Sequence, residues 1–245
     1  MMTFALAFLT LSFAPQEDKE ADKAAADALE KFQKAYKGSD EERKTAIVEL
    51  AKIQHAKVVS KLGTILSGAT PSPVRLAAVT ALSGFTEQKK AATAALANAI
   101  PANAKEPALL SQIFEAIAKL QDPSAVPVLV RYFEDKDLSL AQNATFTTGK
   151  VGHPSGIDPL IALLARNEKA AKPPGAGIGV TANGTNPGQT GGIVVSGSSS
   201  NAQRDRAQAL VSAANRALQE LTKEQLNTAD AWTAWWAKNK ATFKK

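Results

Sequence analysis

The chain has 245 residues, is 44% hydrophobic but only 6% aromatic, and carries a formal net charge of +6. It contains no cysteine, which excludes thiol nucleophiles, disulfides and thiolate metal sites. The basic excess is spread out: residues 1–52 carry eight Lys/Arg against ten Asp/Glu, and residues 53–245 carry 21 against 13. A solvated surface with a basic bias is therefore expected rather than the basic stripe of a nucleic-acid binder.

The N-terminal segment is apolar or hydroxylic from Thr3 to Ala14. Twelve residues are too few to cross a bilayer, which needs about 20, and Ser12-Phe13-Ala14 places small residues where a signal peptidase reads. No Lys or Arg precedes the run and Pro15 would follow the cut, so a retained anchor and a different start stay as alternatives. We predict a signal peptide over residues 1–14, export to the periplasm or the extracellular space, and no transmembrane span in the mature chain.

Helical spacing of apolar residues predicts a series of helices after this segment. An N-terminal capping helix over 15–38 ends at Gly38, and Ser39 to Glu42 forms a capping-box pattern that begins the next helix. Pairs of helices are expected over 40–53 and 55–66, 72–82 and 86–100, 104–120 and 122–133, and 139–151 and 155–166.

A sequence pattern recurs, with substitutions, in the paired helices. Leu50, Leu82, Ile117 and Thr148 take equivalent places in it. The junction Asp122-Pro123-Ser124-Ala125-Val126 also returns one unit later as His153-Pro154-Ser155-Gly156-Ile157. A near-constant step of roughly 30–35 residues indicates stacked helical hairpins, because one hairpin cannot bury its apolar face alone.

The matching features are Val74-Arg75 followed by Ala77-Ala78 and Ala81-Leu82, and the junction at 122–126 followed by Leu129. These residues resemble HEAT repeats over about 40–167 and again at about 204–221. The resemblance implies an all-α, right-handed superhelical α-solenoid in which Arg75 pairs with an Asp of the neighbouring repeat. The fourth unit departs from the pattern at Asn143, Thr145, Thr147 and Thr148, so we expect its first helix to be weak or irregular.

The HEAT-like repeats, 39–168, are followed by a segment of different composition. Residues 171–202 hold eight of the fifteen glycines, which disfavours a helix. We expect a Gly/Pro/Ser-rich insertion over 169–203, as a loop or a small β-hairpin. Residues 204–245 then supply the last repeat helix and a C-terminal capping helix. Its Trp232, Trp235 and Trp236 share one face, as a hydrophobic cap or, alternatively, an aromatic partner site.

Catalytic constellations are not evident in the sequence. His55 and His153 each stand at a predicted helix start without a second His at metal-ligand spacing, which predicts capping or surface roles. The glycines of the insertion lack the GxxxxGK[ST] order of a phosphate loop. We therefore predict no enzymatic activity, no cofactor, no metal site and no small-molecule substrate.

The function expected from these features is a non-catalytic HEAT-repeat scaffold for protein–protein interaction in the cell envelope or outside the cell. The ending of the chain, 217–236, looks like that of exported HEAT-type proteins of environmental bacteria. The expected partner contacts, on the inner surface formed by the second helices, are Lys57, Lys61, Lys89, Lys90, Arg131 and Arg166. Two alternatives stay open: a basic concave face that binds nucleic acid or another anionic polymer, with nucleic acid the less expected, and an accessory subunit or lyase-like enzyme with a groove site.

Overall fold

A computed structural model of the protein describes residues 16–172 and 198–243, so the expected signal peptide and most of the expected insertion lie outside the described residues. The described part is helical and contains no strand. Its elements are α1 (Gln16–Ala35), α2 (Asp40–Leu50), α3 (Ala56–Ser67), α4 (Ser72–Leu82), α5 (Lys89–Asn103), α6 (Pro107–Leu120), α7 (Ala125–Val130), α8 (Leu138–Val151), the short 3₁₀ helix η1 (Pro154–Gly156), α9 (Ile157–Ala171), α10 (Ser198–Thr222) and α11 (Ala229–Asn239). No helix among the described residues has the length and apolar character needed to cross a membrane.

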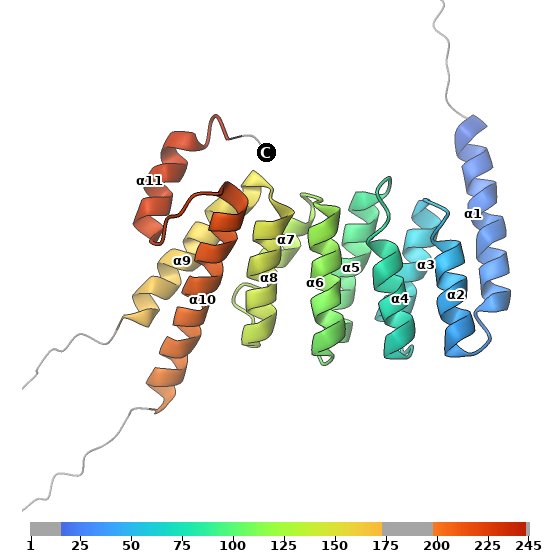
Figure 1. Ribbon diagram of the computed structural model, residues 1–245, viewed down its shortest axis with the longest axis horizontal. Coiled ribbons are helices and arrows are strands. Elements are labelled where there is room, and N and C mark those ends of the chain that lie inside the picture. The colour runs from blue at the N-terminus through green and yellow to red at the C-terminus, as the bar shows by residue number, and fades with distance from the viewer. Residues whose placement is uncertain (1–15, 173–197, 244–245) are drawn as a thin grey trace, which may run out of the picture.

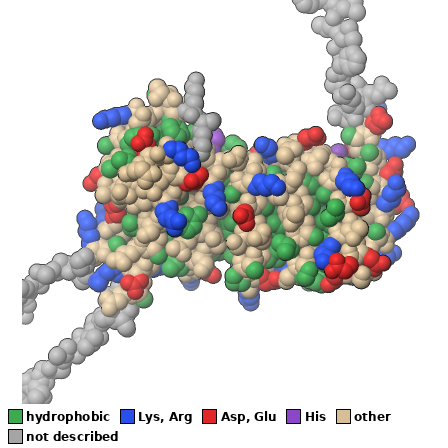
Figure 2. All heavy atoms as spheres, in the orientation of Figure 1, with side chains coloured by type: hydrophobic (Ala, Val, Ile, Leu, Met, Phe, Trp, Pro, Cys, Tyr) green, Lys and Arg blue, Asp and Glu red, His purple; other side chains and the backbone are tan. Residues whose placement is uncertain are grey.

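The helices lie in two rows (Figure 1). The first row is α2, α4, α6, α8 and α10, each packed against the next. Behind it stand α3, α5, α7 and α9, and the rows interlock because α3 packs against α4, α5 against α6, α7 against α8 and α9 against α10. α1 packs on α2 at one end, and α11 packs on α9 at the other. We call the outward side of the first row the front face; it faces the viewer in Figures 1 and 2.

A continuous apolar core runs between the two rows. It joins side chains from every described helix from α1 to α11, beginning at Phe32 and ending at Trp236. Ile47, Leu82 and Ile117, from three consecutive helices of the first row, are fully buried in it. Each helix thus contributes one apolar stripe, and neighbouring helices are needed to complete its burial.

Side-chain caps begin several of the helices. Ser39 and Glu42 form the predicted capping box at α2. The Nδ1 atom of His55 accepts a hydrogen bond from the amide of Lys57 (3.1 Å), and that of His153 accepts one from the amide of Ser155 (3.3 Å). Both histidines therefore cap helix starts, as predicted, and their rings satisfy amide groups that a helix leaves without an internal partner.

α8 is a regular helix over Leu138–Val151, so the expectation of a weak or irregular first helix in the fourth unit is wrong. Two of its threonines, Thr145 and Thr148, are fully buried and hydrogen-bonded. The hydroxyl of Thr145 donates to the carbonyl of Ala141 (2.7 Å), and that of Thr148 donates to the carbonyl of Ala144 (2.9 Å). Because each hydroxyl finds its acceptor within the helix, burial of these polar groups costs little.

Three predicted boundaries also need correction. α9 continues to Ala171 and α10 begins at Ser198, so the expected loop or hairpin over 169–203 is too wide at both ends. The expected start near residue 86 is also wrong: α5 begins at Lys89, and the side chain of its N-cap residue Gln88 makes no capping bond.

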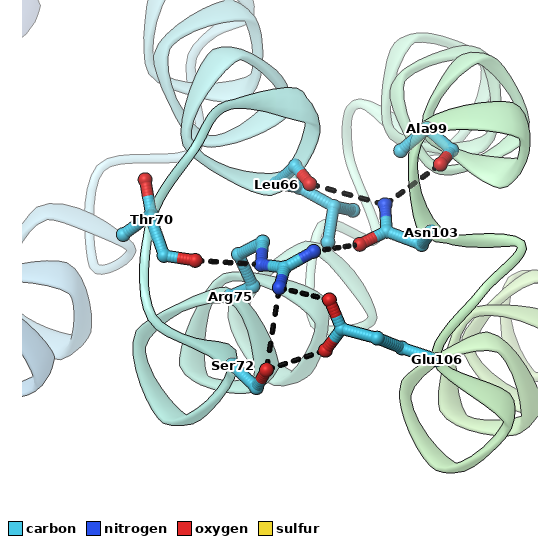
Figure 3. Close-up of polar contacts among 7 residues, drawn as sticks. All are labelled: Leu66, Thr70, Ser72, Arg75, Ala99, Asn103 and Glu106. Atoms are coloured by element: carbon cyan, nitrogen blue, oxygen red, sulfur yellow. Dashed lines mark hydrogen bonds and ion pairs between the residues drawn. The ribbon is translucent and has the colours of Figure 1, made fainter.

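Arg75 joins three segments of the chain (Figure 3). Its Nε donates to the carbonyl of Thr70 (2.8 Å), one Nη donates to Oδ1 of Asn103 (2.6 Å), and the other pairs with the carboxylate of Glu106. The acidic partner is therefore the N-cap residue of α6 and not the Asp that the family resemblance implied. Asn103, itself buried, donates in turn to the carbonyl of Leu66 (3.1 Å), so the network ties α3, α4, α5 and α6 together.

Parts of this network recur at the interval of the sequence repeat. Arg43, one repeat step before Arg75, likewise donates its Nε to a carbonyl that precedes its own helix. Asn167, two repeat steps after Asn103, likewise donates its amide to the carbonyl four positions earlier. The matching arginine contacts are 32 residues apart and the matching asparagine contacts 64 residues apart.

The carboxyl of Glu106 makes the stability contributed by the Arg75 network depend on pH. Hydrogen bonds from the Ser72 hydroxyl and then from Arg75 hold the pKa of Glu106 below its usual value of 4.5. Since the folded-state pKa is depressed, ionised Glu106 stabilises the fold above pH 4.5, and this contribution is lost as the pH falls through the folded-state pKa. We expect Glu106→Gln to lower Tm at pH 7 and the gap to wild type to narrow as the pH falls below 4.5, as followed by circular dichroism. Glu115→Gln, on the same helix, is the control; an unchanged gap at pH 7 and pH 3 contradicts this role for Glu106.

The tryptophans of α11 pack into the core at the C-terminal end. Trp232 is fully buried, Trp236 is 6% exposed, and Trp235 is partly buried beside them, which confirms the predicted apolar face. The indole Nε1 of Trp232 donates to Oδ1 of Asn215 on α10 (2.9 Å), and that of Trp236 donates to Oδ1 of Asp158 on α9 (2.8 Å). Each buried indole therefore has a polar partner, as buried tryptophan requires.

Two further polar contacts fix α11 onto α9. The carboxylate of Glu168 accepts a hydrogen bond from the amide of Ala229, the first residue of α11 (3.1 Å). The Nζ of Lys240 lies 2.9 Å from Oδ2 of Asp158. A carboxylate at the start of α11 and an ammonium just after its end both agree with the direction of the helix dipole.

Candidate functional site

The six basic residues predicted to contact a partner all lie on helices of the second row or at their ends, but their environments differ. Lys57 pairs with Asp22 of α1 (2.6 Å) and holds the pKa of that carboxyl below its usual value. The Nζ of Lys61 lies 5.8 Å from the ring centroid of Phe32. Arg166 lies 2.5 Å from the carboxylate of Glu134, with both side chains well exposed. Three of the six are therefore already engaged within the chain.

The remaining three are Lys89 and Lys90, at the start of α5, and Arg131, exposed at the end of α7. Within residues 16–172 and 198–243, none of these three forms an ion pair. Lys89 and Lys90 are both exposed and adjacent in sequence. They are thus the predicted contact residues best placed to meet a partner.

An apolar groove that sequence reasoning did not nominate lies between α2 and α4 on the front face. Its volume is about 530 Å³, and it is lined by Lys44, Val48, Ala51, Pro73, Leu76, Ala77, Thr80 and Ala81. Val48 is 57% exposed and Leu76 is 41% exposed; in the part of the chain that the structure describes, they are the large hydrophobic side chains left exposed. We call this the α2/α4 groove.

The surface of α4 around this groove is poor in charge. From Ser67 to Thr86 the one charged residue is Arg75, whose side chain is 11% exposed and bound in the network of Figure 3. Pro73, Leu76 and Thr80 follow one another on the outward side of α4, and all three are exposed. Figure 2 shows the front face, where hydrophobic patches lie among scattered charged side chains. An apolar patch with so few charges is typical of surfaces that a partner covers.

A second groove opens further along the front face, where α6, α8 and α10 meet. Its volume is about 400 Å³, and it is lined by Ser111, Phe114 and Glu115 of α6, Asn143, Phe146, Thr147 and Lys150 of α8, and Arg216, Ala217 and Glu220 of α10. We call this the three-helix groove. Its size falls within the range of ligand-binding pockets, and polar groups converge on it from three elements.

The close approach of α8 and α10 builds this groove. A Cβ atom at Gly149 would lie 2.6 Å from the carbonyl oxygen of Ala217 and 2.7 Å from its Cα. Only glycine allows two backbones to come this near without displacement. Lys150 and Arg216, the residues next in sequence to this contact, are brought into one groove by it.

Three of the charged residues that line the three-helix groove, Arg216, Glu220 and Glu115, contact other side chains. The guanidinium of Arg216 lies 5.5 Å from the ring centroid of Phe146, which is half-buried. Glu220 pairs with Lys223 (2.8 Å), and Nε2 of Gln112 donates to Glu115 (3.5 Å). A guanidinium that contacts an aromatic ring through its flat face still has its N–H groups available to bind a planar anion.

In residues 16–172 and 198–243 the structure brings together no group of three or more His, Cys, Asp or Glu side chains that could hold a metal ion. No protein-family model matches the chain, and no curated protein matches it. The two front-face grooves and the basic residues of the second row are therefore the surfaces from which a function can be argued.

Proposed function

We propose that this protein is a HEAT-like, right-handed α-solenoid that serves as a non-catalytic scaffold for protein–protein interaction. The two interlocked rows of helices support the repeat architecture. So does the recurrence of like polar contacts, at Arg43 and Arg75 and again at Asn103 and Asn167, in whole repeat steps. Export through a signal peptide over 1–14, and hence a partner in the cell envelope or outside the cell, belong to the same proposal.

The α2/α4 groove is the observation that carries the binding proposal. Val48 and Leu76 expose apolar surface beside a helix whose only charge is occupied elsewhere. Full burial of one such side chain contributes about 1.5–3 kcal/mol, so a partner that covers both gains substantially. The basic residues of the second row give weaker support to a nucleic-acid or anionic-polymer binder, because Lys57 and Arg166 already pair with carboxylates.

The test compares three versions of the full-length chain in the organism of origin: wild type, Val48→Glu/Leu76→Glu and Lys89→Glu/Lys90→Glu. Each is tagged, cross-linked in the cell, purified and analysed by quantitative mass spectrometry. We expect the same protein partner with wild type and Lys89→Glu/Lys90→Glu, and a loss of about tenfold or more with Val48→Glu/Leu76→Glu, because a carboxylate buried without a partner costs more than about 1.4 kcal/mol. Both double substitutions replace exposed residues, so circular dichroism should show unchanged melting.

The outcomes of this test distinguish the α2/α4 groove from the basic residues of the second row as the contact surface. Loss with Lys89→Glu/Lys90→Glu alone would move the contact surface to the second row, as the sequence first suggested. A wild-type chain that enriches no protein above the tag-only control, in both the periplasmic and the cytosolic fractions, would overturn the scaffold proposal.

A further inference from the structure

We propose that the three-helix groove binds a peptide carboxylate, carried by an Asp or Glu side chain or by a chain terminus of the partner. This inference rests on the proposed function, since it names the chemistry of one contact that the partner makes. It concerns a different site from the α2/α4 groove, formed by other helices of the same row.

The cations of the groove supply the first argument. Lys150 and Arg216 are both exposed and both line the groove. The ring of Phe146 holds the guanidinium of Arg216 at 5.5 Å, which reduces the freedom that the side chain must lose when it binds. Arginine binds a carboxylate with two parallel hydrogen bonds, and lysine adds a point charge to the same oxygen atoms.

The acidic residues of the three-helix groove limit the class of anion that the groove can bind. Glu115 and Glu220 line the same groove as the two cations, so the local charge is mixed rather than strongly positive. A polyanion such as a nucleic-acid backbone or a phosphate cluster would meet repulsion from Glu115 above all, because Glu220 is already paired with Lys223. A single carboxylate can be accommodated between the two cations, Lys150 and Arg216.

The remaining lining suits the polypeptide that carries this carboxylate. Phe114 and Phe146 provide apolar surface at the groove, against which the aliphatic part of a peptide can pack. The partly exposed amide of Asn143 and the hydroxyl of Ser111 line the same space. An amide side chain both donates and accepts, as recognition of a peptide backbone requires.

The test is a titration of ¹⁵N-labelled full-length protein, followed by two-dimensional amide NMR spectra. The first probe is acetyl-Ala-Glu-Leu-Ala-amide, and the matched probe has Gln in place of Glu. We expect the Glu peptide to shift amides of α8 and α10 near Phe146, Lys150 and Arg216, with an affinity about tenfold or more above that of the Gln peptide, because charge-assisted hydrogen bonds are worth about 1.5–3 kcal/mol. A third probe, the Gln peptide with a free C-terminus, distinguishes a terminal carboxylate from a side-chain carboxylate.

Two variants complete the design. Lys150→Gln/Arg216→Gln should abolish the difference between the Glu and Gln peptides, whereas Lys89→Gln/Lys90→Gln, which removes the same charge from α5, should preserve it. The spectra of each variant also report whether it is folded. Equal shifts from the charged and the uncharged peptides, stronger binding of inorganic phosphate than of either carboxylate peptide, or a difference that survives Lys150→Gln/Arg216→Gln would overturn the inference.

Failure of this inference can be told apart from failure of the proposed function. The titration uses no natural partner, so a negative result leaves the partner capture through the α2/α4 groove standing. If the Glu peptide binds while no protein is captured in the cell, the proposed function fails and the chemistry of the three-helix groove stands.

Discussion

Truncation of Trp232 to alanine is expected to destabilise the fold by about 3–5 kcal/mol. The side chain is fully buried in the core beneath α11, and the structure around a deleted indole relaxes only in part, which leaves a cavity. The substitution also removes the donor to Oδ1 of Asn215, which is 9% exposed. A buried acceptor that loses its donor adds its desolvation cost to that of the cavity.

The measurement is urea denaturation followed by far-ultraviolet circular dichroism, which does not depend on the deleted fluorophore. Trp235→Ala is the matched control, because Trp235 lies on the same helix but is only partly buried; we expect it to cost less than half as much. Trp232→Phe keeps most of the apolar volume and removes the hydrogen bond, so it should fall between the two. A free energy of unfolding for Trp232→Ala within about 1 kcal/mol of wild type would contradict a core role for this residue.

Alanine should destabilise the fold at Gly149 but not at Gly63. Both glycines lie inside helices, where alanine is intrinsically favoured by about 1 kcal/mol. A Cβ at Gly149 meets the backbone of Ala217 at 2.6 Å, whereas the nearest atom to a Cβ at Gly63 is the Cβ of Ala95 at 3.1 Å. Admitting a Cβ at Gly63 requires its neighbour to move by only a few tenths of an ångström, whereas at Gly149 the backbone of Ala217 must shift further. We therefore expect Gly149→Ala to destabilise the fold by about 1–3 kcal/mol and Gly63→Ala to be neutral or slightly stabilising.

The same denaturation series measures both glycine variants. Because α8 and α10 must separate to admit the methyl group, Gly149→Ala should also alter the amide spectrum around Lys150 and Arg216, which line the three-helix groove. Stabilisation by Gly149→Ala would mean that the two helices do not approach as closely as described.

The parts of the fold that sequence predicted well are governed by local spacing. The capping box at Ser39 and Glu42, the caps at His55 and His153, and the shared face of Trp232, Trp235 and Trp236 all involve residues within a few positions of one another. Hydrogen bonds and apolar stripes at such distances follow from helix geometry alone. Their side-chain roles could therefore be predicted before any tertiary contact was known.

The errors arose where tertiary packing overrides local preference. The threonines of α8 predicted an irregular helix, but internal hydroxyl bonds and burial make it regular. The acidic partner of Arg75 is Glu106, which stands two helices further along the chain, at the start of α6. An expectation taken from a family resemblance could name the role of this arginine but not its partner in this chain.

The three-helix groove could not have been predicted from spacing. Its lining comes from residues 111–115, 143–150 and 216–220, which meet only when α6, α8 and α10 are packed. One local signal was present: Gly149 stands within a predicted helix, and an isolated helical glycine often marks a close approach of backbones. That signal predicts where two backbones come close, but it does not predict the charged groups on either side of this contact.

The last two helices pack directly on α8 and α9, although residues 173–197 separate α9 from α10 in the sequence. α10 packs on α8 and α9, and α11 is held to α9 through Asp158 and Glu168. All of these described contacts join side chains outside 173–197. Two fragments that divide the chain within that interval would therefore carry, between them, every one of these interfaces. The interval is therefore a natural place to divide the chain for fragment complementation.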